Sequence, residues 1–271
     1  MRFEEQQTVC IHAIPDFWDR LIHARETLLG LDYDGTLAPF HEDRMDAVPY
    51  PGIPPVLKEI RRTTVTEVVI ISGRPLSELS SLMGNVGCLL IGSHGFESLS
   101  PDGHRDWRNP DDLQKRGLAL AKKLGTMDVP GERLEAKIAS VAIHTRGLPP
   151  DQARRIEERI WTRWKEIGDA YDLEPKRFNG GVELRSRGWD KGNVVRSLLR
   201  ARPSDIFAVY IGDDETDEDA FSVIRDRGVG IKVGLPIRAT AAQGFLADSS
   251  QVKLFLEKWL RKAPCRIQGE S

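Results

Sequence analysis

Short, continuous apolar runs recur along this chain of 271 residues and are separated by longer amphipathic stretches. The runs are TLLGLD at 27–32, EVVIIS at 67–72, CLLIG at 88–92, FAVYIG at 207–212 and VGIKV at 229–233. Apolar runs without a polar alternation are typical of parallel strands that are covered on both faces. They therefore predict the strands of a buried parallel sheet.

The stretches between these runs carry apolar residues at helical spacing. Helices are predicted at 53–62, 75–83, 191–201 and 252–260. Pro75 suits the first turn of the second helix, and Ser249 or Ser250 is expected to cap the last one. Because strands and helices alternate, the predicted fold class is α/β, with a doubly wound, Rossmann-like parallel sheet.

The segment from about 111 to 185 departs from this alternation. Its pattern is helix, strand, strand, helix, strand, strand, which predicts a small α+β unit. The second of these helices carries an apolar stripe made of Ile156, Ile160, Trp164 and Ile167. Such a stripe is more often core than a partner site. We expect a core domain formed by 1–108 and 187–271, with a cap domain inserted at 109–186.

Composition argues against several classes of function. The formal net charge is −2 and basic residues are not clustered, so no nucleic-acid surface is expected. No apolar stretch approaches the roughly 20 residues that a membrane span needs. Cys10, Cys88 and Cys265 form no disulfide framework, and the N-terminal MRFEEQQTVC is unlike a signal peptide. We expect a cytoplasmic, monomeric protein that binds neither nucleic acid nor membrane.

Polar residues stand where three of the predicted strands end. Asp32 ends the first strand, Ser72 ends the second, and Asp213 follows the fourth. Each of them alone is explained by a cap or a turn. In an open α/β sheet, however, ligands bind beyond the carboxyl ends of the strands. The three residues together predict a site at that edge of the sheet.

Asp32 and Asp34 are two residues apart, so their side chains point the same way if the chain is extended. Two carboxylates that close raise one another's pKa unless a cation lies between them. Mg²⁺ meets that need when a phosphate shares its ligand shell. Asp32 is then a candidate nucleophile, and Asp34 a general acid and base. Gly35 allows a sharp turn, and the backbone N–H of Thr36 can bind phosphate.

The motif DYDGT, which begins at Asp32, resembles the first motif of the haloacid dehalogenase superfamily of phosphatases. Ser72 in ISGR matches the second motif, Lys191 in DKG matches the third, and Asp213 lies in the acidic fourth. The resemblance implies phosphoryl transfer through an aspartyl-phosphate, with Ser72 and Lys191 holding phosphoryl oxygens. It also implies Mg²⁺ bound by Asp32, the backbone carbonyl of Asp34, and Asp213.

Further residues receive roles from the same resemblance. Gly73 and Arg74 complete the ISGR motif and are assigned to the substrate. Asp217, in the acidic motif, is expected to orient Lys191 or a metal-bound water. Asp214 is expected to hold a second water.

A narrower resemblance covers most of the chain, from about residue 27 to 233. The segments LDYDGTL, ISGR, IGSHGFE, SVAIHTR, VELR, DKG and GDDETDEDAF are similar to those of trehalose-6-phosphate phosphatases. This resemblance implies Mg²⁺-dependent hydrolysis of trehalose 6-phosphate to trehalose and phosphate, the last step of trehalose biosynthesis. It also implies a cap between the second and third motifs, where the α+β unit is predicted.

The resemblance assigns five residues to the sugar, namely His94, Lys137, His144, Arg146 and Glu183. Each also has an ordinary structural explanation. Lys137 can be a solvated surface lysine, and His94 can satisfy a turn carbonyl. His144 and Arg146 can face solvent or pair with Glu183. Glu183 can also simply balance Arg185.

Two departures from the family lie in or beside the cap. Thr145 stands where an aromatic residue is usual, and Ser186 stands where Pro often follows V-E-L-R. These departures leave open a related phosphatase for sucrose phosphate or another glycosyl phosphate. A phosphomutase is a second alternative. A catalytically silent regulatory module is a third, although it would lack motif residues that are all present here.

Overall fold

Five strands of the structure, a computed structural model that describes residues 9–10 and 14–266, coincide with the predicted apolar runs. They are β2 (Thr27–Leu31), β3 (Thr66–Ile71), β4 (Leu89–Gly92), β11 (Phe207–Gly212) and β12 (Gly228–Val233). They lie in the order β12-β11-β2-β3-β4 and all are parallel. The strand order reverses at β2, and open α/β sheets bind their ligands at such a switch point.

Four short strands extend this sheet at its edges. β13 (Gly244–Leu246) and β1 (Val9–Cys10) continue it in parallel beyond β12. β5 (Glu97–Leu99) and β6 (Arg105–Trp107) form antiparallel pairs beyond β4. None of the four was predicted, because segments of two or three residues are too short to carry a periodic signal.

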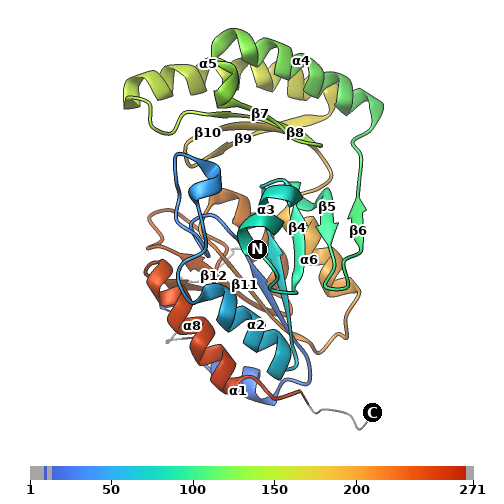
Figure 1. The fold of residues 1–271 in the computed structure, drawn as a ribbon, viewed down its shortest axis with the longest axis vertical. Helices are drawn as coiled ribbons and strands as arrows, with labels where there is room; N and C mark the ends of the chain where they lie inside the picture. Colours follow the sequence, from blue (N-terminus) through green and yellow to red (C-terminus); the bar gives the residue numbers. More distant parts are fainter. Residues whose placement is uncertain (1–8, 11–13, 267–271) are drawn as a thin grey trace, which may run out of the picture.

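Helices cover both faces of the parallel sheet (Figure 1). One face packs against α1 (Phe17–His23), α2 (Ile53–Thr63), α3 (Leu76–Met83) and α8 (Ser249–Lys262), and the other against α6 (Lys191–Arg200) and α7 (Glu218–Ile224). Along β3, Val68 and Ile70 belong to the first apolar layer, whereas Val69 and Ile71 belong to the second. The prediction of a doubly wound sheet is therefore confirmed.

Two predicted helix starts need correction. Pro75 is the N-cap of α3 rather than part of its first turn. The cap of α8 is Asp248, not Ser249 or Ser250, and its carboxylate accepts the N–H of Ser250 at 2.9 Å. A carboxylate at this position also complements the positive end of the helix dipole, which a serine hydroxyl does not.

The chain after β6 forms a second, antiparallel sheet that lies above the first in Figure 1. Its elements are α4 (Asp112–Asp128), β7 (Leu134–Ala136), β8 (Ser140–His144), α5 (Pro150–Tyr171), β9 (Leu173–Phe178) and β10 (Gly181–Ser186). The strand order is β7-β8-β10-β9. The predicted order of helices and strands is confirmed. We call this unit the cap and keep 109–186 as its proposed limits.

The cap has an apolar core of its own. Ile160 and Trp164 of α5 are fully buried and Ile167 nearly so, in a cluster with β8 and β10. Ile156 packs at the edge of the same cluster. The predicted stripe is thus core packing. Because α4 and α5 cover the outer face of this sheet, its other face is turned toward the parallel sheet (Figure 1).

Two connections bring chemically active residues to the junction of cap and core. β10 ends at Ser186, and α6 of the core begins five residues later at Lys191. The long loop between β2 and α2 rises toward the cap and carries the 3-10 turn η2 (Arg44–Asp46) (Figure 1). Both connections therefore contribute to the space between the two sheets.

Two predictions from the sequence concern membranes and export. Among the helices of the described residues, none has the length and apolar character that crossing a membrane requires. Most of the MRFEEQQTVC segment, on which the prediction about a signal peptide depends, lies outside the described residues.

Candidate active site

Three adjacent strand ends carry the predicted motif residues to one place. Asp32 follows β2, Ser72 follows β3, and Asp213 follows β11. β2 lies between the other two strands, in parallel register with both. Lys191, at the first position of α6, reaches the same edge of the sheet. The sheet topology thus brings together residues that are up to 181 positions apart in the sequence (213 − 32).

Lys191 binds two carboxylates at the floor of this site. Its Nζ donates to Oδ1 of Asp32 and to Oδ1 of Asp217, each at 2.6 Å, and all three side chains are buried. Burial alone would lower the pKa of Lys191, but the charges of Asp217 and Asp32 raise it above its usual range. The ammonium group therefore stays charged without water around it.

Asp217 is a support for its neighbours rather than an open ligand. Its Oδ1 also accepts the Tyr210 hydroxyl at 2.7 Å. Its Oδ2 accepts the backbone N–H groups of Asp213 at 3.1 Å and Asp214 at 3.0 Å. With both oxygens engaged, Asp217 orients Lys191 and shapes the loop that presents Asp213.

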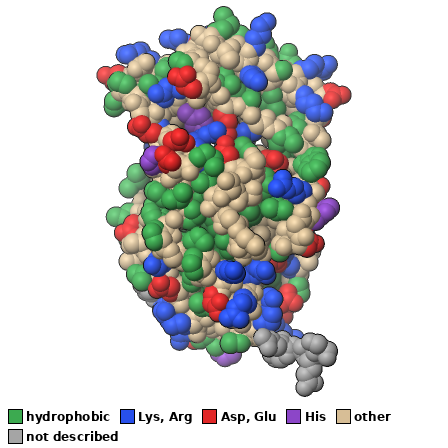
Figure 2. Space-filling model, in the orientation of Figure 1, with side chains coloured by type: hydrophobic (Ala, Val, Ile, Leu, Met, Phe, Trp, Pro, Cys, Tyr) green, Lys and Arg blue, Asp and Glu red, His purple; other side chains and the backbone are tan. Residues whose placement is uncertain are grey.

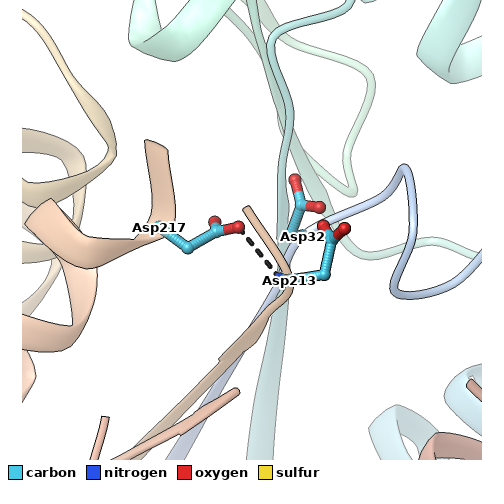
Figure 3. Close-up of side chains that lie close together, drawn as sticks. All are labelled: Asp32, Asp213 and Asp217. Atoms are coloured by element: carbon cyan, nitrogen blue, oxygen red, sulfur yellow. Dashed lines mark hydrogen bonds between the residues drawn. The ribbon is translucent and has the colours of Figure 1, made fainter. Parts of the chain in front are cut away.

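Asp32, Asp213 and Asp217 each offer an oxygen within 4.8 Å of the others. Figure 3 shows the carboxyl groups of Asp32 and Asp213 side by side, with Asp217 turned to the backbone of Asp213. Burial raises the pKa of Asp32 to about 8. Burial and the charge of Asp32 raise the pKa of Asp213 to about 9. Oδ1 of Asp213 is buried and has no hydrogen-bond partner, so the pair matches a site that a dication completes.

Asp34 lies apart from this cluster because Arg74 holds it. Arg74 donates to both carboxylate oxygens of Asp34 at 2.7 Å, a bidentate ion pair. Of the groups that raise the pKa of Asp32, Asp34 is the weakest and Asp217 contributes more. The expected repulsion between Asp32 and Asp34 is therefore present, but it is weaker than that between Asp32 and Asp217.

The turn after Asp34 depends on a glycine. Gly35 has φ +79°, and a Cβ there would lie 2.2 Å from the Asp213 carboxylate. Thr36 does not reach the site: its N–H is directed at the Tyr33 carbonyl at 3.3 Å, within the turn. The turn thus uses that N–H in this structure, and the expected contact between Thr36 and phosphate stays a prediction.

Ser72 and His94 are joined by a backbone hydrogen bond, in which the N–H of His94 donates to the Ser72 carbonyl at 3.0 Å. Oγ of Ser72 accepts the N–H of Arg74 at 3.1 Å, which leaves its hydroxyl hydrogen for a ligand. A Cβ on Gly73 would lie 2.7 Å from the His94 ring. His94 itself has φ +56° in the 3-10 turn η3 (Ser93–Gly95). This uncommon backbone conformation directs its ring upward to the cap.

Glu183 of β10 joins His94 and Lys137, two residues that were predicted separately, and it also contacts Ser140. It accepts from Nζ of Lys137 at 2.9 Å and from Oγ of Ser140 at 2.6 Å, and it pairs with Nε2 of His94 at 2.8 Å. Burial would raise the pKa of Glu183, but Lys137 and His94 hold it well below 4.5. Glu183 balances the charge of Lys137 and shares a hydrogen bond with His94, whose pKa is lowered by burial, and Arg185 contacts Glu174 and Asp219 instead.

His144 and Arg146 do not pair with Glu183. Nε2 of His144 lies 2.9 Å from Oε2 of Glu135. Burial would raise the pKa of Glu135, but His144, Lys137 and Arg44 lower it to about 2. The guanidinium of Arg146 lies over the Phe40 ring, 4.6 Å from its centroid. Both side chains thus line the space between cap and core.

A cavity that is open to solvent lies between these floor and roof residues. Every predicted site residue lines it except Thr36 and Asp217, the second of which lies directly beneath. Figure 2 shows charged side chains gathered along the hollow between the two parts of the molecule.

Comparison with known proteins places the chain in a family. The family model described as trehalose-phosphatase matches residues 30–255, which include the whole cavity. The chain belongs to the trehalose-phosphatase family. The match spans both the parallel-sheet core and the cap.

Curated relatives of this family are moderately similar. A trehalose-phosphate phosphatase of Mycobacterium leprae is 30% identical over 262 residues, covering 88% of this chain and 58% of the relative. A probable trehalose-phosphate phosphatase C of Arabidopsis thaliana is 32% identical over 259 residues, covering 88% and 78%. The chain thus spans a little over half of the bacterial relative and about three quarters of the plant one.

Solved structures show the same fold. The C-terminal domain of a Candida albicans trehalose-6-phosphate phosphatase has a TM-score of 0.81 at 24% identity, covering 95% of this chain and 99% of that one. A haloacid dehalogenase-like hydrolase of Bacteroides thetaiotaomicron has a TM-score of 0.59 at 16% identity, covering 86% and 99%. The expected haloacid dehalogenase-like core is therefore confirmed.

The two departures from the family pattern lie away from the cavity. The hydroxyl of Thr145 donates to Glu157 of α5 at 2.5 Å. Ser186 is buried and its N–H donates to the Ala139 carbonyl at 2.8 Å. Neither residue lines the cavity, so neither changes what it presents to a ligand.

Several cavity residues were missed by sequence reasoning, namely Phe40, Arg44, Glu135, Phe178, Asn179 and Thr216. Glu135 could have been found, because it stands two residues before Lys137 in the predicted strand RLEAKIAS, and an extended chain puts both side chains on one face. Arg44 and Phe40 lie in the loop after β2, where no periodic sequence pattern indicates which way a side chain points. Only the position of the cap over that loop reveals them.

Proposed function

We propose that this protein hydrolyses trehalose 6-phosphate to trehalose and phosphate. The observation that carries the proposal is a single cavity with two chemically different ends. Its floor holds Asp32, Lys191 and Asp213, whereas its roof holds charged cap residues such as Lys137 and Glu183. A sugar phosphate offers its phosphate group to the floor and its sugar hydroxyls to the roof. Membership of the trehalose-phosphatase family favours trehalose 6-phosphate among such esters.

The floor suits Mg²⁺. Its open donors are carboxylate and carbonyl oxygens, the ligands that Mg²⁺ prefers. Asp32, Asp213 and the backbone carbonyl of Asp34 would hold the ion, and the unpartnered Oδ1 of Asp213 supports this. When bound, Mg²⁺ would offset the negative charge on the carboxylates and the phosphoryl oxygens.

Asp32 is the proposed nucleophile. Lys191 engages its Oδ1, which leaves Oδ2 to attack phosphorus. The bond from Oδ2 to phosphorus forms as the bond from phosphorus to the sugar oxygen breaks. Ser72 and Lys191 hold phosphoryl oxygens while an aspartyl-phosphate replaces the ester. Water then attacks the same phosphorus and releases phosphate and the free Asp32 carboxylate.

Asp34 is the proposed proton carrier. In the structure Arg74 binds both oxygens of its carboxylate, the form that accepts a proton from the hydrolytic water. In the first step the leaving sugar oxygen needs a proton from Asp34. That step requires the ion pair with Arg74 to loosen when substrate enters.

The cap residues are proposed to recognise the sugar. Glu183, Lys137 and His94 hold one another in place, as do Glu135 and His144. Charged groups fixed in this way form strong, directional hydrogen bonds to hydroxyls. The same set could hold another glycosyl phosphate, so sucrose phosphate remains the second candidate.

Some expectations stay proposals. We propose a cytoplasmic monomer that binds neither nucleic acid nor membrane. Cys10, Cys88 and Cys265 are free thiols, which supports a reducing compartment.

A substrate panel tests the proposal. Phosphate release is measured from trehalose 6-phosphate, sucrose 6-phosphate, glucose 6-phosphate and an aryl phosphate, each with Mg²⁺ and with chelator. We expect Mg²⁺-dependent preference for trehalose 6-phosphate. Preference for sucrose 6-phosphate would mean that the proposed substrate is wrong but that the proposed reaction at the floor still holds. Turnover of the aryl phosphate alone would contradict the assignment of the cap residues.

A further inference from the structure

Arg44 joins the cap to the core from a loop with no assigned role. It lies in η2, on the loop that rises from β2 toward the cap. Its guanidinium forms an ion pair with Glu135 of β7, in the cap, and another with Glu78 of α3, in the core, at 2.9 Å. The carboxylates are largely buried, with 10% of the Glu135 side chain and 18% of the Glu78 side chain exposed. Arg44 thus bridges two carboxylates, one on a helix of the core and one on a strand of the cap.

The same arginine touches the group that holds Asp34. Arg74 donates from Nη1 to the backbone carbonyl of Arg44 at 2.7 Å. Nη1 of Arg74 also lies 3.4 Å from Glu78. Charges therefore alternate without interruption from Asp34 through Arg74, Glu78 and Arg44 to Glu135. Such a chain fixes its members more firmly than isolated pairs do.

We propose that Arg44 is a latch and a positioning residue. It holds β7 of the cap against the core, it orients the Glu135 carboxylate at the cavity, and it keeps Glu78 in place beside Arg74. Closing of the cap is thereby linked to the position of Asp34. The part of this inference that concerns sugar selectivity depends on the proposed function, whereas the latch itself does not.

The latch can be separated from other roles by one substitution. Arg44→Gln removes both ion pairs but keeps the backbone carbonyl that binds Arg74. Largely buried carboxylates that lose their cation leave a costly unpaired charge, whereas an exposed pair contributes little. Arg62, paired with Glu59 on the exposed face of α2, is the matched control. Arg62→Gln removes a similar ion pair far from the cap.

The first test measures cap position without substrate. Spin labels are attached at Met127→Cys on α4 and Leu254→Cys on α8, both exposed, after Cys10 and Cys265 are replaced by Ser. Distance distributions are recorded for the otherwise unchanged chain, the Arg44→Gln variant and the matched control. We expect Arg44→Gln to lengthen or broaden the distribution and the control to leave it unchanged. Identical distributions in all three would overturn the latch.

The second test compares substrates. Arg44→Gln should lower kcat/KM for trehalose 6-phosphate about 10-fold more than kcat/KM for an aryl phosphate, which needs no cap contact. Arg44→Lys, which keeps the charge, should recover part of that ratio. If selectivity falls while cap distances do not change, Arg44 is a substrate ligand and the latch is refuted. If the unchanged chain does not hydrolyse trehalose 6-phosphate, the proposed function fails, and the distances still decide the latch.

Discussion

At the scale of single residues, charge placement decides the chemistry of the floor. Lys191 neutralises part of the negative charge of Asp32 and Asp217, yet the pKa of Asp32 is still raised to about 8 because burial dominates. A buried carboxyl group of this kind is a poor anion without a further cation. Mg²⁺ binding and nucleophilic attack are therefore linked in our account.

Asp32→Asn should abolish turnover while the fold stays intact. The amide is not a nucleophile, and Lys191 keeps Asp217 as its partner. Removing one of three crowded carboxyl groups leaves stability equal or higher. Phosphate release and thermal unfolding are measured on the same preparation. Turnover near the wild-type rate would remove Asp32 from the role of nucleophile.

Mg²⁺ should stabilise the folded chain. An ion that binds only the folded state adds ~2.7 kcal/mol at 100 times its Kd, which is several degrees in Tm for a protein of this size. Asp213→Asn removes a proposed ligand and should abolish the shift, whereas the exposed control Asp205→Asn should retain it. Equal shifts in all three proteins would place the ion elsewhere.

At the scale of elements, the cap is a unit with its own apolar core. Trp164 of α5 is fully buried within it and belongs to neither apolar layer of the parallel sheet. The cap strands present polar groups to the cavity on their other face. Packing on one face thus positions recognition residues on the other.

Trp164→Ala should destabilise the cap by about 3–5 kcal/mol, because a large buried side chain is lost and a cavity remains. Hydrolysis of trehalose 6-phosphate should fall more than hydrolysis of an aryl phosphate. Trp107 of β6, with 60% of its surface exposed, is the control, and Trp107→Ala should cost less than about 0.5 kcal/mol. Denaturant unfolding is the measurement, and equal losses for the two variants would contradict the expectation.

A comparison of the predicted and observed elements shows which features could be predicted from the sequence. The five buried strands and the order of the cap elements were predictable because apolar periodicity reports them directly. Asp32, Ser72 and Asp213 were predictable because strand ends meet at one edge of a sheet. The pair of Asp34 with Arg74, the pair of His94 with Glu183 and the bridge at Arg44 were not. These contacts depend on how distant segments of the chain meet, and no local sequence pattern records that.

At the scale of the whole molecule, contacts between buried polar and charged side chains join the cap to the core. His94 of the core meets Glu183 of the cap, and Arg44 of the core meets Glu135 of the cap. Between them lies the cavity in which both parts present their groups. A sugar phosphate that fills this cavity would therefore contact both parts.

Acid should weaken this junction. The pKa of Glu183 is held well below 4.5 and that of Glu135 is lowered to about 2. Groups with a lowered folded pKa stabilise fully above their unfolded value of about 4.5, and they lose that effect progressively as pH falls from there through their folded values. We expect the free energy of unfolding to decrease by about 1–3 kcal/mol between pH 6 and pH 3 through these groups.

Variants separate the effect of the cap carboxylates on stability in acid from the effect of Asp32 and Asp213. The pKa values of Asp32 and Asp213 are raised, so these two groups favour the folded state more as pH falls. Glu183→Gln should be less stable than wild type at pH 6 but should lose less stability toward pH 3. The control is Glu158→Gln, an exposed position on the same cap. A Glu183→Gln profile parallel to wild type would contradict the account.

The central claim is that Asp32 takes the phosphoryl group of trehalose 6-phosphate. The most direct test is rapid acid quench of the protein with Mg²⁺ and trehalose 6-phosphate, followed by mass analysis of the intact chain and of its peptides. Our account predicts one added phosphoryl group, located on Asp32 and absent from Asp32→Asn and from chelated samples. Steady release of phosphate with no phosphoryl group on Asp32 under these conditions would contradict it.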